Sequence, residues 1–439
     1  MLEMISKLRT GKSYAGFVRA EHILHGSPKL LFHLHIIFNA MLQHSYVPTL
    51  LLRGNISPLV KDRDSPMSDS SNYRPITLSQ IFVQMYETLE KSKFGYFLPQ
   101  SDHQFGFKPG LSTSHAIYSL KKTVDYFTGN GSRVFLSFLD CSKAFDRISH
   151  WGLFVKLIKQ NVPLCFLLSV MYLYLNMSCT VKWNEKMSGS FDKPTGTKQG
   201  GILSPDFFSM YMHDLIERLK LCGFGCDVIQ MCISCIFFAD DVVLLSPSRH
   251  GLQQLLNICA TYCKEYCLDF NVKKSKIMII GKKLTESHFA SLLLNDQPLE
   301  FVKEYKYLGV ELCAGKTLTF SPLSMIRSFH RAANAIFYSR VKPSETVLMK
   351  LLYTNCVPII TYASAAREFC SSDMYRCHVA INNAIRKIFS FRVWQSIRHL
   401  RISHGFKSIY EIYSSAKAKF LANALTSSNS IVCHLSSLI

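Results

Sequence analysis

Two adjacent carboxylates, Asp240 and Asp241, lie between two short apolar runs, Ile236–Phe238 and Val242–Leu245. Each run has the length and composition of a buried strand, so the segment predicts a strand, a tight turn and a second strand. Neighbours in a flat strand point to opposite faces, whereas at a hairpin tip both side chains can face the same space. Two like charges about 4 Å apart repel by about 4 kcal/mol at an effective dielectric near 20. A positive partner, most simply a divalent metal ion, is therefore expected beside them.

A third carboxylate, Asp140, ends another predicted strand that begins at Val134. It precedes Asp240 by 100 residues (240 − 140), so only the fold can bring the two together. Two-metal phosphoryl transfer needs such a set, because two ions about 3.5–4 Å apart stabilise the attacking and leaving oxygens. Hard ions such as Mg²⁺ prefer carboxylate oxygens and retain water molecules. Aspartate also favours turns through its own backbone hydrogen bonds, so the pair Asp240-Asp241 taken alone favours a simple turn over a metal site.

The elements that would position these carboxylates alternate between strands and helices. Strands are predicted at residues 55–61, 134–140 and 276–280, and a strand or hairpin at 304–312. Helices are predicted before residue 43, from 79 to about 97, from 114, after Ser142 as the capping residue, from 204 to about 220, from 251 to 266, and over most of the chain after 321. The apolar run 163–177 is shorter than a membrane span and is typical of a buried helix.

The composition predicts a globular chain that binds a polyanion. Of the 439 residues, 48% are hydrophobic and 18% charged, which allows two or three domains and a substantial core. The formal net charge of +20 favours nucleic acid over a membrane as the partner. The 15 cysteines, an odd number in mostly apolar contexts, are typical of free thiols in a reducing, intracellular compartment. The charged opening segment does not resemble a secretory signal.

Seven sequence blocks follow one another between residues 72 and 309. They are Asn72-Tyr73-Arg74-Pro75-Ile76, Gln104-Phe105-Gly106-Phe107-Lys108-Pro109-Gly110, Phe138-Leu139-Asp140-Cys141-Ser142-Lys143-Ala144-Phe145-Asp146, Gln199-Gly200 through Leu203-Ser204-Pro205, Phe238-Ala239-Asp240-Asp241, Asn271 with Lys274-Ser275-Lys276, and Tyr307-Leu308-Gly309. In this order the chain resembles reverse transcriptases, most closely the polymerase domain of non-LTR (LINE-type) retrotransposons. The resemblance spans over half of the chain and favours a metal site at Asp240-Asp241 over a simple turn.

The resemblance implies an α+β right-hand polymerase fold of fingers, palm and thumb, with an antiparallel palm sheet that carries the three aspartates. Residues 1–54 would form an N-terminal helical extension and residues 55–133 the fingers. Residues 134–315 would form the palm, with part of the fingers between the first palm strand and the Gln199-Gly200 loop. Residues 316–439 would form the thumb and a helical C-terminal region.

The resemblance also implies roles for individual residues. Asp140 and Asp240 would be the principal catalytic metal ligands, and Asp241 a more peripheral one. The residues implied in binding the dNTP are Lys61, Arg74, Phe145, Gln199, Gly200 and Lys274. Tyr307, Leu308 and Gly309 would grip the primer end, for which a plain strand and turn is the alternative.

Each implied dNTP contact has a physical rationale. Lys61 and Arg74 would hold the triphosphate, and arginine suits bidentate phosphate contacts. For Lys61 a solvated surface position is the alternative. Phe145 would leave no room for a 2′-hydroxyl, although ordinary helix packing is the alternative. The Gln199-Gly200 loop would contact the nucleotide, because glycine lets the backbone approach closely. Lys274 would lie near the leaving pyrophosphate, with general-acid action as one option.

The C-terminal part of the chain is strongly basic. From Lys316 to Ile439 it has 16 Lys and Arg against 4 Asp and Glu, a net of +12 (16 − 4). No acidic residue occurs from Arg386 to Lys407, where aromatic residues alternate with arginines. Primer and template contacts are therefore expected from Arg392, Arg398 and Arg401, through the phosphate backbone. A solvated helix face is the alternative.

With these features, the resemblance implies an RNA-directed DNA polymerase from a LINE-type mobile element, which would extend a primer 3′-hydroxyl with dNTPs by two-metal catalysis. The cofactor would be two Mg²⁺ ions, with Mn²⁺ as a substitute. The partners would be an RNA template, a DNA primer or target and dNTPs, with no membrane, and the location would be the nucleus if genomic DNA is the target. Two alternatives stay open: an intron-type reverse transcriptase or RNA-templated RNA polymerase, and a catalytically silent relic that only binds nucleic acid. Phe145 argues against an RNA product, and the intact aspartates argue against a relic.

Overall fold

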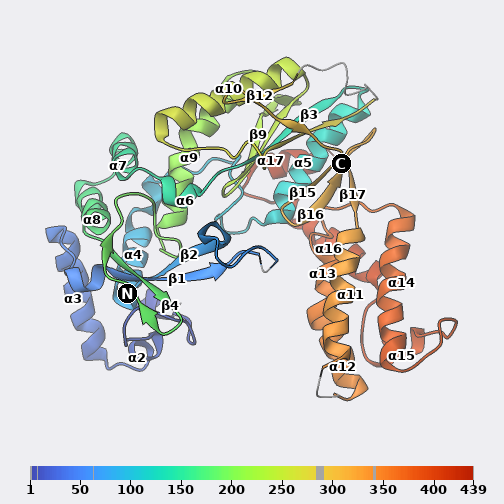
Figure 1. The fold of residues 1–439 in the computed structure, drawn as a ribbon, viewed down its shortest axis with the longest axis horizontal. Helices are drawn as coiled ribbons and strands as arrows, with labels where there is room; N and C mark the ends of the chain where they lie inside the picture. The colour runs from blue at the N-terminus through green and yellow to red at the C-terminus, as the bar shows by residue number, and fades with distance from the viewer. Residues whose placement is uncertain (1, 7, 63, 283–290, 340–342, 439) are drawn as a thin grey trace. The chain divides into compact units, whose positions relative to one another are not determined.

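The fold is mixed α+β, as the sequence predicts (Figure 1). A computed structural model describes residues 2–6, 8–62, 64–282, 291–339 and 343–438. The chain forms two compact units, each assembled from distant segments. The first unit contains Met1–Ser101, Cys141–Arg218 and Ile258–Phe270, and the second unit contains Asp102–Asp140, Leu219–Asn257 and Asn271–Ile439.

A five-stranded sheet forms the centre of the second unit. Its order is β14-β11-β3-β10-β9, and all neighbours pair antiparallel except β11 and β14, which are parallel. The strands are β3 (Val134–Asp140), β9 (Cys235–Phe238), β10 (Asp241–Ser246), β11 (Lys276–Ile280) and β14 (Glu300–Phe301). The strands at 134–140 and 276–280 and the hairpin around Asp240-Asp241 are therefore confirmed.

The sheet is covered on both faces, which explains the continuous apolar runs of its strands. The first six residues of β3 are buried, and so are all residues of β10 after Asp241. One face, formed by Val134, Leu136 and Phe138 of β3 and their neighbours, is covered by helix α5 (Thr113–Gly129), helix α17 (Ser430–Ser437), the short strands β7 (Cys226–Val228) and β8 (Met231–Ile233), and the three-stranded sheet of β15 (Glu304–Tyr307), β16 (Val310–Cys313) and β17 (Thr319–Ser321).

The predicted helices after residue 321 are confirmed, and most of them pack around a core of their own within the second unit (Figure 1). They are α11 (Leu323–Phe337), α12 (Glu345–Leu351), a π-helical segment Leu352–Cys356, α13 (Val357–Thr361), α14 (Ser371–Ile388), α15 (Arg398–Ser403) and α16 (Ile409–Leu425). Helix α17 instead returns to the sheet, where its N-cap Asn429 donates to the Asp102 carbonyl at 2.8 Å.

The first unit combines a second sheet with helices. Strand β1 (Arg53–Val60) pairs antiparallel with β2 (Tyr73–Leu78) and parallel with β4 (Ser178–Trp183). β4 also pairs with the short strands β5 (Lys186–Met187) and β6 (Phe191–Asp192). Helices that lie wholly or mainly in this unit are α1 (Leu2–Ser6), α2 (Ala20–Leu24), α3 (Pro28–His44), α4 (Ile81–Phe94), α6 (Ala144–Arg147), α7 (His150–Lys159), α8 (Leu164–Leu175) and α9 (Ser204–Leu221). Helix α10 (Arg249–Tyr266) is shared between the two units.

Two local predictions differ from the structure. Ser142 is not a helix cap: its backbone N–H donates to the Asp269 carbonyl at 2.8 Å, and α6 begins two residues later, after Lys143 at a left-handed φ of 48°. The apolar run 163–177 does form helix α8, but Leu164 is 67% exposed and Leu175 50% exposed, so the helix is buried on one side only. No helix within the described ranges is long and apolar enough to cross a membrane.

Candidate active site

The three aspartates lie together at one end of two neighbouring strands of the second unit. β3 ends at Asp140, β10 begins at Asp241, and these two residues are direct partners in the antiparallel pairing. Residues directly opposite in such a pair have Cα atoms about 4.5–5.5 Å apart. Asp240 occupies the turn before β10, in which Phe238 pairs with Asp241 and Ala239 has a left-handed φ of 57°. The fold thus brings Asp140 beside the acidic pair, as predicted.

An adjoining loop supports the Asp240 turn. Gln104 is buried, and its Oε1 accepts hydrogen bonds from the backbone N–H groups of Gly106 (2.9 Å) and Ala239 (3.0 Å). The Phe105 N–H donates to the Phe237 carbonyl at 2.8 Å, so the loop runs along β9. A Cβ atom on Gly106 would lie 2.4 Å from the Ala239 nitrogen, so only glycine permits this close approach. Gln104 and Gly106 therefore position the aspartate turn.

The site is electrostatically crowded. Desolvation of its carboxyl group and the like charges of Asp240 and Asp140 raise the pKa of Asp241 to about 6. The same charges affect Tyr305 on β15. Burial is the main cause that raises the pKa of the Tyr305 hydroxyl to about 12, and the charges of Asp241 and Asp140 add to it. Like charges disfavour one another's ionised forms, and a nearby cation would reverse this effect. The arrangement is therefore suited to binding a cation.

The segment 271–275 is docked on Asp140. The Asn271 N–H donates to the Asp140 carbonyl at 2.8 Å, and the Asp140 N–H donates to the Ser275 hydroxyl at 3.3 Å. These bonds bring Lys274 to the carboxylate, with Nζ 3.9 Å from Asp140 Oδ2. The Lys274 side chain is 69% exposed, so it remains accessible to a ligand. Of the residues predicted to bind the dNTP, Lys274 therefore lies beside Asp140 within the second unit.

The predicted primer-grip residues form a hairpin turn. Tyr307 pairs with Val310, which leaves Leu308 (φ 44°) and Gly309 (φ 81°) as a two-residue loop of the left-handed kind. The Tyr362 hydroxyl donates to the Leu308 carbonyl at 3.1 Å, and a Cβ on Gly309 would lie 3.2 Å from the Tyr362 ring. Tyr362 thus fixes the loop, a role that its sequence position did not reveal.

The other predicted nucleotide-binding residues lie in the first unit. Lys61 follows β1, and its Nζ donates to the Ser71 carbonyl at 2.8 Å. Arg74 is exposed on β2, opposite Leu59 of β1. Both cations are therefore carried by one antiparallel hairpin and are accessible at its surface.

The Gln199-Gly200 loop is held against β2. The Thr77 N–H donates to the Gln199 carbonyl at 2.8 Å. Gly200 has a φ of 114°, and a Cβ atom there would lie 2.9 Å from the Thr77 carbonyl oxygen. Glycine is therefore required by contacts within the protein, whatever its role toward a ligand. The Gln199 side chain also has a partner, because its Nε2 donates to Asp146 Oδ2 at 3.1 Å.

Phe145 is half-buried on the short helix α6. Its ring stacks on Phe208, with centroids 4.8 Å apart and an interplanar angle of 22°. Its carbonyl accepts a hydrogen bond from the Thr197 N–H at 2.7 Å, which ties α6 to the Gln199 loop. The packing role weighed from the sequence is therefore present, and it fixes the ring in place.

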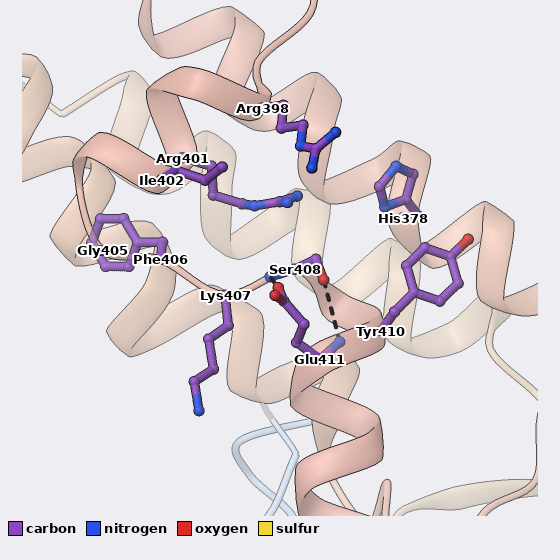
Figure 2. A pocket seen from close by; sticks show the side chains of 10 residues that line it. All are labelled: His378, Arg398, Arg401, Ile402, Gly405, Phe406, Lys407, Ser408, Tyr410 and Glu411. Atoms are coloured by element: carbon purple, nitrogen blue, oxygen red, sulfur yellow. Dashed lines mark hydrogen bonds between the residues drawn. The ribbon is translucent and has the colours of Figure 1, made fainter.

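Two of the three predicted template-binding arginines share a pocket. Arg398 and Arg401 on α15 line a cavity of about 530 Å³, and Figure 2 shows them facing the start of α16. The other lining residues are His378, Ile402, Gly405, Phe406, Lys407, Ser408, Tyr410 and Glu411. Arg392 is not among them: its guanidinium lies 5.3 Å from the ring centroid of Trp394.

The aspartates do not form a preassembled metal cage. Within the described parts of the chain, no three His, Cys, Asp or Glu side chains are grouped so that they could hold a metal ion on their own. Mg²⁺ usually binds through one or two carboxylates together with water and substrate phosphates, so a complete protein cage is not required. The donor set at Asp140, Asp240 and Asp241 fits that kind of binding.

Comparison with known proteins identifies the family. The model of the reverse transcriptase (RNA-dependent DNA polymerase) family matches residues 60–312, more than half of the chain. The chain belongs to the reverse transcriptase family. The match contains the three aspartates, the Gln199 loop and the Tyr307 hairpin.

Curated relatives of this reverse transcriptase chain come from insect mobile elements. It is 27% identical over 380 residues to a probable RNA-directed DNA polymerase from transposon BS of Drosophila melanogaster, which covers 82% of the chain and 41% of that protein. It is 24% identical over 377 residues to the RNA-directed DNA polymerase from mobile element jockey of Drosophila funebris, which covers 82% of the chain and 40% of that protein. The chain thus spans about two fifths of the length of these relatives. A solved structure of telomerase from Candida tropicalis is similar with a TM-score of 0.49 and 9% identity, over 94% of this chain and 74% of that one.

A buried carboxylate that the sequence did not single out supports the reverse transcriptase loop around Gln199. Glu87 on α4 accepts a hydrogen bond from Lys198 Nζ at 3.1 Å and one from the Ile202 N–H at 2.8 Å. Its two oxygens therefore hold the loop on both sides of Gln199 and Gly200. The Lys198 and Glu87 side chains are 3% and 4% exposed, so this ion pair is buried. Its partners lie 111 residues apart (198 − 87), which explains why spacing gave no signal.

One turn further along α4, a second carboxyl group is buried beside this ion pair. Glu90 is fully buried, and neither of its oxygens has a hydrogen-bond partner among the described residues. Burial raises the pKa of Glu90 to about 8, and the negative charge of Glu87 adds to this effect. Glu90 is therefore protonated at neutral pH, which avoids a second buried charge next to Glu87.

We expect Glu90 to make stability depend on pH. Between the unfolded pKa of 4.5 and the folded pKa of about 8, the folded protein retains a proton that the unfolded chain has released. Its contribution to the free energy of unfolding should therefore fall as pH rises through this window, by about 1.4 kcal/mol per pH unit, and level off above it. Relative to wild type, Glu90→Gln should gain stability from pH 5 to pH 8 in urea unfolding. The exposed control Glu185→Gln should show a constant difference, and a constant difference for Glu90→Gln would contradict the assignment.

Proposed function

We propose that this chain is the catalytic part of an RNA-directed DNA polymerase from a LINE-type mobile element. The observation that carries the proposal is the pairing of Asp140 with Asp241, beside Asp240 in the turn, within the segment that matches the reverse transcriptase family. The reaction is the attack of a primer 3′-hydroxyl on the α-phosphate of a dNTP, directed by an RNA template. The fold class is α+β, and we assign it a right-hand layout: fingers at 55–133, palm at 134–315, and thumb with the helical C-terminal region at 316–439.

We assign metal binding to the carboxylates of Asp140, Asp240 and Asp241, with Mg²⁺ as the ion and Mn²⁺ as a substitute. Two such ions supply the charge that stabilises the attacking and leaving oxygens. The carboxylate oxygens of the three aspartates are the ligands. Asp140 is the last residue of β3, Asp240 lies in the turn, and Asp241 is the first residue of β10. The raised pKa of Asp241 is consistent with a site built for a cation.

The remaining residues bind the substrates. Lys61, Arg74 and Lys274 neutralise the triphosphate, since cations hold phosphate oxygens through charge-assisted hydrogen bonds. Phe145 blocks a 2′-hydroxyl, and Gln199 with Gly200 contacts the nucleotide. Tyr307, Leu308 and Gly309 grip the primer end, while Arg392, Arg398 and Arg401 bind the phosphate backbone. Action on genomic DNA would place the protein in the nucleus.

Primer extension on purified protein tests the function. With an annealed RNA template, dNTPs and Mg²⁺, the wild type should extend the primer, and the isosteric variants Asp140→Asn and Asp240→Asn should not, because they lose a charged metal ligand. The control Asp296→Asn replaces an exposed aspartate in a left-handed turn and should keep full activity. A folded wild type that binds primer–template but synthesises nothing would instead identify a silent nucleic-acid-binding relic.

Sugar selection tests the role of Phe145. Phe145→Ala should raise the relative use of ribonucleotides about 10-fold or more, because removing the ring opens space for a 2′-hydroxyl. Phe145→Tyr keeps the ring over Phe208 and should keep the discrimination. The measurement is kcat/KM for one dNTP and the matching NTP. If a folded, active Phe145→Ala enzyme discriminates like wild type, the ring serves packing alone.

Salt dependence tests the basic C-terminal segment. Each duplex phosphate contacted contributes about −0.9 to the slope of log affinity against log salt. Replacing Arg392, Arg398 and Arg401 with glutamine should make this slope shallower by about two to three units if all three contact phosphate. The loss should be alike for all sequences, because backbone contacts carry no base information.

A matched triple variant controls for net charge in the salt experiment. Replacing the exposed Lys12, Lys29 and Lys159 with glutamine removes the same total charge from the first unit. This variant should keep the wild-type slope. An unchanged slope in the arginine variant would assign that segment to a solvated helix face.

A further inference from the structure

Two arginines of α15 line the cavity next to the start of α16. Arg398 and Arg401 occupy positions i and i+3 of the helix, which are neighbours on its surface. Figure 2 shows both side chains reaching into the space between His378 and Ser408. Within the described ranges neither guanidinium has a hydrogen-bond or ion-pair partner, and the Arg401 Nε–H is shielded from water. A shielded donor without a partner is unfavourable, so the cavity is suited to a ligand that brings acceptors.

A simple anion does not match the cavity, because a carboxylate lines it as well. Glu411 Oε2 accepts a hydrogen bond from the Ser408 N–H at 2.5 Å, and the Ser408 hydroxyl accepts one from the Glu411 N–H at 3.2 Å. The hydrogen bonds from Ser408, and then the charges of Arg401 and Lys407, lower the pKa of Glu411, which is therefore ionised at neutral pH. An ionised carboxylate only accepts hydrogen bonds. A matching ligand thus presents an anionic group to the arginines and a hydrogen-bond donor to Glu411.

An exposed aromatic ring forms another wall of the cavity. Tyr410 is 43% exposed, and its ring lies against His378, with centroids 5.2 Å apart. Burial, and then the charges of Arg401 and Arg386, lower the pKa of His378, so this imidazole is uncharged at neutral pH. The cavity volume of about 530 Å³ is far more than a phosphate ion fills and lies in the range of small-molecule sites. Cations beside a ring that is free to stack are the combination that binds nucleotides of single strands.

We propose that this cavity binds one unpaired nucleotide of an RNA strand, with its phosphate on Arg398 and Arg401 and its base stacked on Tyr410. The 2′-hydroxyl of that nucleotide is the donor for Glu411, which distinguishes RNA from DNA. The inference builds on the proposed phosphate contacts of the two arginines. It adds a ligand that a blunt duplex does not supply, because paired bases stay stacked in the helix. Binding at this site requires neither a metal ion nor a dNTP.

The affinities for single-stranded RNA and for a blunt RNA–DNA duplex test the site. Both probes are about 12 nucleotides long, and binding is measured by fluorescence anisotropy without dNTPs or divalent metal. Tyr410→Ala should weaken binding of the single strand about 10-fold, the contribution of one stacked base, and leave the duplex affinity unchanged. Tyr410→Phe keeps the ring and should keep the affinity. The control Tyr96→Ala removes a tyrosine of the first unit that is 78% exposed, and it should bind both probes like wild type.

The preference for RNA over DNA tests the hydroxyl contact. Glu411→Gln retains a side chain that can cap α16 with Ser408, but a neutral amide accepts more weakly than a carboxylate. The ratio of the affinities for single-stranded RNA and for DNA of the same sequence should therefore fall about 3-fold. Equal affinities for RNA and DNA in the wild type, or an unchanged ratio in Glu411→Gln, would overturn the proposal of an RNA site.

Further outcomes separate the nucleotide from other ligands. Equal losses for single strand and duplex in Tyr410→Ala would overturn the proposal, since they would indicate a structural defect or a duplex contact. Inorganic phosphate that displaces the single strand as effectively as adenosine 5′-monophosphate would also overturn it, because the base would then contribute nothing. So would a polyglutamate peptide that binds more tightly than the RNA and loses affinity in Tyr410→Ala.

Failure of this inference is distinguishable from failure of the proposed function. A protein that shows the expected binding but extends no primer would overturn the proposed function alone. An active polymerase whose affinity for the single strand is unchanged by Tyr410→Ala would overturn only the inference.

Discussion

The repulsion among three carboxylates is the constraint on which the site depends. Asp140 and Asp241 are held opposite each other by the backbone pairing of β3 with β10, and Asp240 adjoins them in the turn. At about 4 Å each like-charge contact costs about 4 kcal/mol at an effective dielectric near 20. Only a rigid frame can hold such groups together, and the buried, fully paired strands beneath them provide it. The positive φ of Ala239 adds strain, and the hydrogen bond from the Ala239 N–H to Gln104 Oε1 stabilises this conformation.

The loop around Gln199 is likewise fixed by the structure around it, through hydrogen bonds to polar groups on other elements. Glu87 bonds to residues on both sides of Gln199, Thr77 bonds to its backbone, and Asp146 bonds to its side chain. The cost of burying the Glu87 carboxylate is met by Lys198 and by the Ile202 N–H, which together satisfy both oxygens. A buried ion pair contributes little net stability but specifies one arrangement of the loop, and the proposed contact with a nucleotide requires that arrangement before the ligand binds.

The sequence predicted what depends on local pattern and missed what depends on distant contacts. β3 at 134–140 and β11 at 276–280 have the predicted bounds, because each is a short apolar run that ends at a polar turn. Ser142 looked like a helix cap, but Asp269, far along the chain, takes its N–H. From the sequence, the glycine at position 200 was attributed to close approach of a ligand. In the structure, the Thr77 carbonyl oxygen already leaves no room for a side chain there. Glu87 gave no signal of its own, since Lys198 and Ile202 are more than a hundred residues away. Gln104 belongs to a recognised sequence block, but its hydrogen bond from Ala239, 135 residues away, could not be predicted from spacing.

The C-terminal helix α17 does not belong to the helical bundle in which the sequence alone would place it. Residues after 321 form a helical bundle with its own core, yet α17 packs on α5 beside the sheet that carries the aspartates. Ser430 donates to the Asp102 carboxylate, and His434 Nε2 lies 2.9 Å from the Val228 carbonyl, so polar contacts fix the helix as well. The apolar strands β3 and β10 are buried on both faces only with such cover. The rigidity that holds three like charges together is therefore supplied in part by residues about 190 positions beyond Asp240 (430 − 240).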